Sequence, residues 1–194
     1  MFKYLEYCAS DKMGDIIKED LDRHFAYLKE CYQYAKEYSH DKSTWNSAKL
    51  IRNDGIPIAI EANRVMEGIE PTEEILTKRP DKYFYTGHAE ERVLWKALDM
   101  GFTDFKNSTM FCPWYACHTC ARTILGFGVG RIIGHQSPMD WDGEIARKGD
   151  GRMEWLPSIE AAWNMFRKRG VDFRYLIGKI GGVENLHAGR IFYP

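Results

Sequence analysis

Apolar residues in the first third of the chain predict one long helix followed by a pair of strands. Between residues 15 and 38 apolar side chains recur every three or four positions, which is the spacing of one helical face. Short apolar stretches at 48–51 and 56–60 flank the turn-forming sequence Asn-Asp-Gly at 53–55. We therefore expect an amphipathic helix over 15–38 and a hairpin after it.

The stretch 61–85 shows no clean period and contains one glycine and two prolines. We expect it to be mostly loop, with a short helix near 72–78 for which Thr72 can provide the N-terminal cap. Long loops inside compact domains are often functional. This stretch is therefore a candidate neighbour of a binding site.

The second half of the chain alternates between helical and strand-like patterns. In chain order we expect a helix over 89–100 ending at Gly101, a strand over 108–112, a helix over 117–126 closed by glycine, a strand over 131–135, a polar stretch over 136–157, a helix over 158–169 and a strand over 171–177. This order predicts an α/β fold with a mixed sheet of about five strands and helices on both faces. Residues 181–194 fit either a last edge strand or a contact with a neighbouring subunit.

Composition limits the classes of protein to which the chain can belong. Its 194 residues, of which 44% are hydrophobic, are enough for one well-filled domain, so we expect a single domain over 1–194. A formal charge of −1 provides no positive field for a nucleic acid, so we expect no stable nucleic-acid partner. No apolar stretch is long enough to span a membrane. Five cysteines, an odd number, together with an early charged N-terminus, favour a reducing, cytoplasmic location.

Two short motifs carry candidate chemistry. His88, Ala89 and Glu90 begin one predicted helix, and Cys117 and Cys120 begin another. Taken alone, the first motif fits an ordinary helix start, and the second fits a redox pair, half of a zinc site or two buried thiols. Taken together, one imidazole and two thiolates can bind one Zn²⁺ and leave a fourth position open, as catalytic zinc sites do. Glu90 then lies beside that position, where it can carry protons.

These motifs resemble the signature of the zinc-dependent cytidine and deoxycytidylate deaminases, H-x-E followed by P-C-x-x-C. Three further segments, at 39–44, 61–68 and 79–83, are similar to stretches of the deoxycytidylate branch, and the resemblance covers roughly 27–176. It implies the three-layer α/β/α cytidine-deaminase-like fold, with 1–26 and 178–194 as extensions of one deaminase domain.

The resemblance also implies an activity. The expected reaction is the zinc-dependent hydrolytic deamination of deoxycytidylate (dCMP) to deoxyuridylate (dUMP) with release of ammonia, with His88, Cys117 and Cys120 as ligands of one Zn²⁺ and Glu90 as the catalytic proton carrier. The implied substrate contacts are Asn63, Ala89 and Tyr115. The expected partners are a small nucleotide and further copies of the chain in a homo-oligomer. By residue type alone, Asn63 also fits a turn and Tyr115 also fits the core.

The chain departs from the family pattern directly before the cysteine motif. Ala116 stands where the family has proline, and Pro113 lies four residues before Cys117. Proline is favoured at a helix start for its fixed φ, so we expect Cys117 to remain a ligand. Cys112 is the alternative ligand, and otherwise it is a buried thiol, like Cys8 and Cys31.

Alternative functions remain open at the level of sequence. The chain could deaminate another free nucleoside, nucleotide or base, or it could edit a nucleic acid. From a different class, a structural zinc module would use the same ligands without turnover. Such sites normally close with a fourth protein ligand, and no further histidine or cysteine is obviously placed to provide one.

Overall fold

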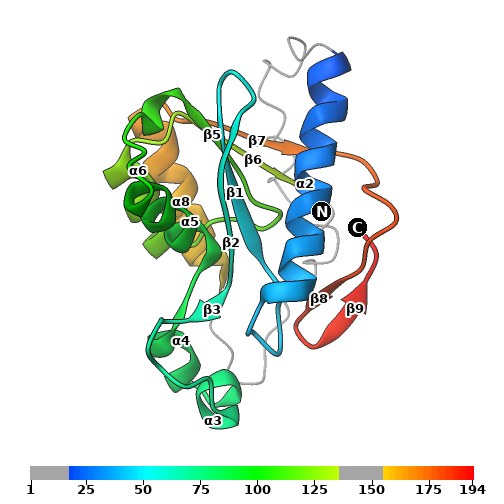
Figure 1. The fold of residues 1–194 in the computed structure, drawn as a ribbon, viewed down its shortest axis with the longest axis vertical. Coiled ribbons are helices and arrows are strands. Elements are labelled where there is room, and N and C mark those ends of the chain that lie inside the picture. Colours follow the sequence, from blue (N-terminus) through cyan, green and yellow to red (C-terminus); the bar gives the residue numbers. More distant parts are fainter. Residues whose placement is uncertain (1–17, 136–154) are drawn as a thin grey trace.

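A five-stranded mixed sheet forms the centre of the computed structural model, which describes residues 18–135 and 155–194 (Figure 1). Strand β1 pairs antiparallel with β2 and β5, whereas β5, β6 and β7 run parallel to one another. The strands lie in the order β2 (Pro57–Ala62), β1 (Ser47–Arg52), β5 (Ser108–Phe111), β6 (Arg131–His135) and β7 (Asp172–Leu176). The expected mixed sheet is therefore confirmed.

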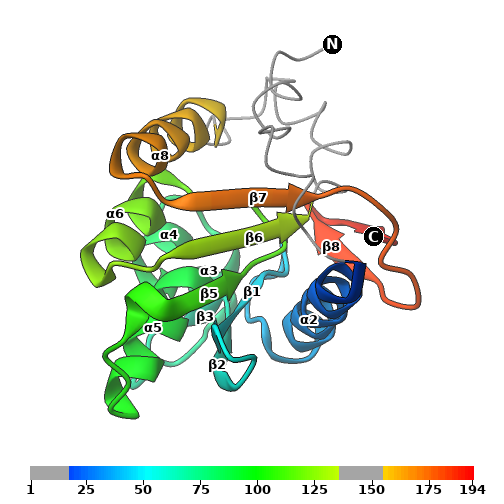
Figure 2. The ribbon, with the colours of Figure 1, turned by 90° about the horizontal axis from the view of Figure 1, so that it is seen from above.

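Helices cover both faces of this sheet and make three layers (Figure 2). One face is covered by α2 (Lys18–Tyr38), and the other by α5 (Ala89–Asp99), α6 (His118–Phe127) and α8 (Trp155–Arg169). Alternation along β1 explains how one strand serves both layers. Leu50 belongs to the core beneath α5 and α6, while Ile51 belongs to the core beneath α2.

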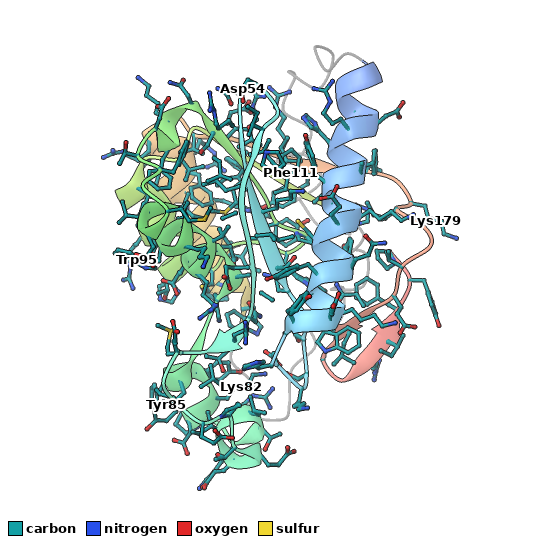
Figure 3. The ribbon with its side chains drawn as sticks, viewed as in Figure 1. Asp54, Lys82, Tyr85, Trp95, Phe111 and Lys179 are labelled. Atoms are coloured by element: carbon teal, nitrogen blue, oxygen red, sulfur yellow. The ribbon has the colours of Figure 1, made fainter. Side chains whose placement is uncertain are left out.

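The core beneath α2 is built around an aromatic side chain of β5. Phe111 is buried and packs against the rings of His24 and Tyr27 from α2 (Figure 3). Leu28 and Cys31 of the same helix face complete this contact. The apolar face predicted over 15–38 therefore packs on the sheet wherever the helix is described.

Helix ends differ from the prediction in two places. Helix α6 continues through Gly126 and ends at Gly128, which takes the left-handed conformation with φ of 79° and donates its N–H to the carbonyl of Ile124. Gly128, and not Gly126, is thus the residue that stops the helix, because the left-handed conformation favours glycine. Helix α8 begins at Trp155, three residues earlier than Ser158, and the polar stretch predicted before it lies mostly outside the described residues.

The stretch 61–85, predicted to be mostly loop, contains more regular structure than expected, as do the two residues that follow it. The expected short helix is present as α3 (Glu73–Thr77), with the Thr72 side chain accepting a hydrogen bond from the Ile75 N–H. Additional elements are β3 (Arg64–Val65), α4 (Asp81–Tyr85) and β4 (Thr86–Gly87), and β3 pairs with β4. These elements of two to five residues are too short to show a period, so the prediction of mostly loop was wrong here.

The C-terminal residues form their own hairpin rather than a last strand of the main sheet. Strands β8 (Asn185–His187) and β9 (Arg190–Phe192) pair antiparallel in a separate two-stranded sheet. Phe192 is buried against the rings of Tyr32 and Trp114. The hairpin therefore packs beside α2 within the same molecule (Figure 1).

Among the helices of the described ranges, none has the length and apolar content that a membrane crossing requires.

Candidate active site

Two helix starts meet beside the end of β5 and bring the predicted ligands together. His88 directly precedes α5, Cys117 directly precedes α6, and Cys120 lies in the first turn of α6. Neither His88 nor Cys117 makes a side-chain capping hydrogen bond to its own helix. Their side chains are instead directed toward each other, as the contacts below show.

The three donor atoms have the spacing of ligands around one ion. The Nδ1 atom of His88 lies 3.3 Å from the Cys120 Sγ and 3.6 Å from the Cys117 Sγ, and the two sulfur atoms are 3.5 Å apart. A tetrahedral Zn²⁺ with normal bond lengths separates such donors by about 3.5–3.8 Å. The three residues therefore form a possible metal site, in which shifts of a few tenths of an ångström bring the donors to the spacing of zinc ligands.

Electrostatics favour the deprotonated sulfur that a metal needs. The hydrogen bond with Cys120 lowers the pKa of Cys117 to about 3 against the effect of burial, and the same contact raises the pKa of Cys120 well above its usual range. Burial lowers the pKa of His88, but its hydrogen bond with Cys117 and nearby negative charges outweigh burial and bring it to about 9. A divalent cation can replace the protons of His88 and Cys120.

Glu90 lies in the first turn of α5 and is almost fully buried, with 3% of its surface exposed. Burial raises the pKa of its carboxyl group to about 7, with the charge of His88 acting in the opposite direction. Its Oε2 atom accepts a hydrogen bond of 3.4 Å from the side-chain amide of Asn46. Glu90 is thus a buried carboxyl group next to the possible metal site and outside its donor set.

Asn63 and Ala89 are brought together at the same helix start. The Asn63 Oδ1 atom accepts a hydrogen bond of 2.9 Å from the backbone N–H of Ala89, and both residues are buried. Asn63 follows the last residue of β2, as its turn-like character predicts. The predicted contact of Asn63 and Ala89 with substrate stays a prediction.

Aromatic residues lie around the site. Two of them, Tyr83 and Trp155, were not predicted as site residues from the sequence. Tyr115 packs against the rings of Tyr175 and Trp163, at centroid distances of 4.1 Å and 5.4 Å, so its predicted substrate contact stays a prediction. Trp155 lies 6.2 Å from the His88 ring and 6.1 Å from the Tyr83 ring. Tyr83 falls in the family-like segment 79–83, but no period or motif marks Trp155.

The remaining cysteines occupy other places. Cys112 is buried beside Asn46 and does not join the three-donor group, so the structure gives no support to its use as the alternative ligand. Cys31 is a buried thiol on the face of α2 that packs on the sheet, as expected, and Cys8 lies outside the described residues.

A buried ion pair joins the loop before β1 to helix α4. The Nζ atom of Lys82 lies 2.7 Å from Asp41 Oδ1, and both side chains are less than a tenth exposed. The same oxygen accepts hydrogen bonds from the backbone N–H groups of Ser43 and Thr44. Lys82 points from α4 toward this loop (Figure 3). Nothing in the sequence indicated this pair, because its partners are 41 residues apart.

Comparison with known proteins agrees with the geometry of the site. Residues 21–136, more than half of the chain, match the family model described as the cytidine and deoxycytidylate deaminase zinc-binding region. The chain belongs to this family. Its cofactor is therefore zinc, for which His88, Cys117 and Cys120 form a possible site. A comparison of the deaminase with curated proteins finds no match.

Two solved structures of a phage enzyme share the fold of this chain at low sequence identity. A dCMP deaminase from the cyanophage S-TIM5, in complex with dCMP and dUMP, is 19% identical with a TM-score of 0.58, covering 83% of this chain and 100% of the phage chain. Its apo form is 18% identical with a TM-score of 0.55, covering 80% and 98%. A guanine deaminase from Nitrosomonas europaea is 14% identical with a TM-score of 0.46, covering 79% and 76%. At these identities the two phage structures show a likeness of fold alone, and the score of the guanine deaminase is too low to show one.

The donor set predicts which cysteine controls the zinc content. Cys120→Ala removes one of three ligands and is expected to lower bound zinc from about one ion per chain to less than about 0.1 after dialysis against a weak chelator. Cys112→Ala, which removes a buried thiol outside the donor set, is the matched control and should keep its zinc. Elemental analysis measures both variants, and an equal loss of zinc from both would contradict the assignment of ligands.

The buried ion pair predicts a large effect on stability. Lys82→Met leaves Asp41 buried without its cation and is expected to lower the free energy of unfolding by about 3–5 kcal/mol. Lys78→Met removes an exposed pair with Glu74, which water screens, and should leave the free energy of unfolding nearly unchanged. Urea denaturation compares the two variants, and similar losses would show that the Lys82 contact contributes no more than a surface pair.

Proposed function

We propose that the chain catalyses the hydrolytic deamination of dCMP to dUMP with release of ammonia. The single observation that carries this proposal is the buried Glu90 carboxyl group next to three metal donors that it does not join. Three protein ligands leave a fourth position for water, which distinguishes a catalytic zinc site from a closed structural one. Support for the nucleotide comes from the resemblance of the segments around 61–68 and 79–83 to the deoxycytidylate branch.

Zinc bound to His88, Cys117 and Cys120 would supply Lewis acidity, lowering the pKa of a water to about 7. The rest of the chemistry falls to Glu90. Its carboxylate takes one proton from the attacking water and delivers it to N3 of the pyrimidine ring. It then takes the second proton from the added hydroxyl group and delivers it to the departing amine, which leaves as ammonia. Water and dCMP thereby become dUMP and ammonia.

Substrate contacts are part of the same proposal. Asn63, held by the Ala89 N–H, can donate from its Nδ2 atom to an oxygen of the sugar or base. Ala89 lies fully buried beside it, and Tyr115 would contribute an aromatic wall. The partner is a small nucleotide, and we expect the enzyme to act as a homo-oligomer.

Replacing the proton carrier separates catalysis from metal binding. Glu90→Gln keeps the shape of the side chain but cannot carry the proton, so we expect kcat for ammonia release to fall at least about 100-fold with zinc retained. Glu91→Gln is the matched control, since Glu91 accepts a hydrogen bond from Thr123 on the neighbouring helix. It should change kcat less than about twofold. Full activity of Glu90→Gln would refute the assigned role.

The nucleotide is tested with a panel of free substrates on the zinc-loaded protein. We expect kcat/KM for dCMP to exceed that for deoxycytidine at least about tenfold, because a charge-assisted contact to the 5′-phosphate adds binding energy. Cytidylate, adenosine and guanine complete the panel, with released ammonia as the readout. If the protein prefers guanine or adenosine, that compound and not dCMP is the substrate. If no compound releases ammonia, the result favours a structural zinc module.

A further inference from the structure

Asn46 directly precedes β1, and its side chain contacts Glu90. The proposed reaction gives this contact no role. Asn46 is 5% exposed, and its Nδ2 atom donates to the Oε2 atom of Glu90 at 3.4 Å. An amide buried to this degree is destabilising unless its polar atoms find partners. The Asn46 side chain therefore depends on the polar groups around Glu90, and Glu90 in turn receives a donor from the sheet.

The thiol of Cys112 contacts both polar atoms of this amide. Cys112 Sγ lies 3.7 Å from Asn46 Oδ1, where its S–H donates, and 3.5 Å from Asn46 Nδ2. Burial, aided by the charge of Glu90, raises the pKa of Cys112 well above its usual range, so the sulfur keeps its proton. An S–H that donates to Oδ1 is compatible with the amide orientation that directs Nδ2 toward Glu90.

The backbone around Asn46 is held on several sides. The Trp45 N–H donates to the Leu186 carbonyl of the C-terminal hairpin, and the Trp45 carbonyl accepts from the Trp114 ring nitrogen. The Asn46 carbonyl accepts from the Asn63 N–H at 3.0 Å. Asn46 therefore presents its amide from a fixed position, with the hairpin as one of the supports.

Asn46 and Asn63 together hold two consecutive residues at the start of α5. Asn63 binds the backbone N–H of Ala89, and Asn46 binds the side chain of Glu90. We propose that Asn46 is a positioning residue, which fixes the Glu90 carboxylate for proton transfer and is itself oriented by the Cys112 thiol. This inference rests on the proposed function, because it assigns Asn46 a role in the reaction of Glu90.

The physical basis is the freedom of a carboxylate. A Glu side chain rotates about several bonds, and its terminal bond is only weakly restricted. A donor on Oε2 holds the plane of the carboxylate and so directs Oε1, which can then exchange a proton over a short, constant distance. Removing the donor should slow turnover without weakening substrate binding.

Kinetics of two adjacent variants test this role. Asn46→Ala is expected to lower kcat about 10- to 100-fold, with KM within about threefold and zinc retained. Ser47→Ala is the matched control, because it removes the buried hydrogen bond of the next residue to the Cys31 carbonyl, on the opposite face of β1. It should leave kcat within about twofold. Thermal unfolding of both variants shows whether a lower kcat comes from slower catalysis or from loss of the folded state.

Substitutions of Cys112 provide a second test, which stays informative if the Asn46→Ala variant does not fold. Cys112→Ala removes the S–H donor and is expected to lower kcat in the same direction as Asn46→Ala. Cys112→Ser restores a donor on a side chain close in size to alanine and should be more active than Cys112→Ala. The reverse order would refute the orienting role of the thiol, since only the donor distinguishes these predictions.

Nuclear magnetic resonance reports the contact without turnover. In the zinc-loaded protein, Glu90→Ala should shift the side-chain NH₂ resonances of Asn46, whereas Glu91→Gln should leave them in place.

Unchanged resonances in Glu90→Ala would overturn the proposal, as would an Asn46→Ala variant with normal kcat. A raised KM at unchanged kcat would also overturn it, by making Asn46 a substrate contact. If the wild-type protein releases no ammonia from any substrate, the proposed function fails and the catalytic role of Asn46 fails with it.

Discussion

The meeting of two helix starts beside the end of β5 is the constraint on which the site depends. A ligand before α5 and two at the beginning of α6 come within 4.8 Å of one another only if both helices pack on the same face of the sheet. The core beneath these helices, with Leu94 and Ile124 fully buried, sets that packing. Burial of apolar surface thus determines where an imidazole and two sulfur atoms can share an ion.

The antiparallel part of the sheet supplies the polar groups around the metal donors. Strand β1 starts and strand β2 ends at the edge where β5 ends, so Asn46, Asn63 and Cys112 lie together. The loop before β1 is joined to α4 by the ion pair of Asp41 and Lys82, so α4 also supports this part of the chain. The parallel strands place the helices, while the antiparallel strands place the groups that contact the helix start.

The long elements and the metal donors could be predicted because each leaves a local mark in the sequence. The face of α2 and the glycine after α5 are visible as periods and stop signals, and the family-like spacing of His88, Cys117 and Cys120 indicated their meeting. Contacts between distant residues left no such mark. The contacts of Lys82 with Asp41 and of Asn46 with Glu90 join residues more than 40 positions apart, and the small elements within 61–87 were too short for any period. Gly126 was mistaken for the helix stop because spacing alone does not reveal which glycine adopts a positive φ.

The account makes Glu90 the proton carrier of a hydrolysis, so the new oxygen of the product must come from water. Zinc-loaded protein incubated with dCMP in water enriched in ¹⁸O tests this directly by mass spectrometry of the product. The account predicts dUMP carrying one ¹⁸O atom in its base for each ammonia released, with dUMP incubated alone as the control for exchange. Conversion of dCMP without incorporation of the label, or no conversion at all, would contradict it.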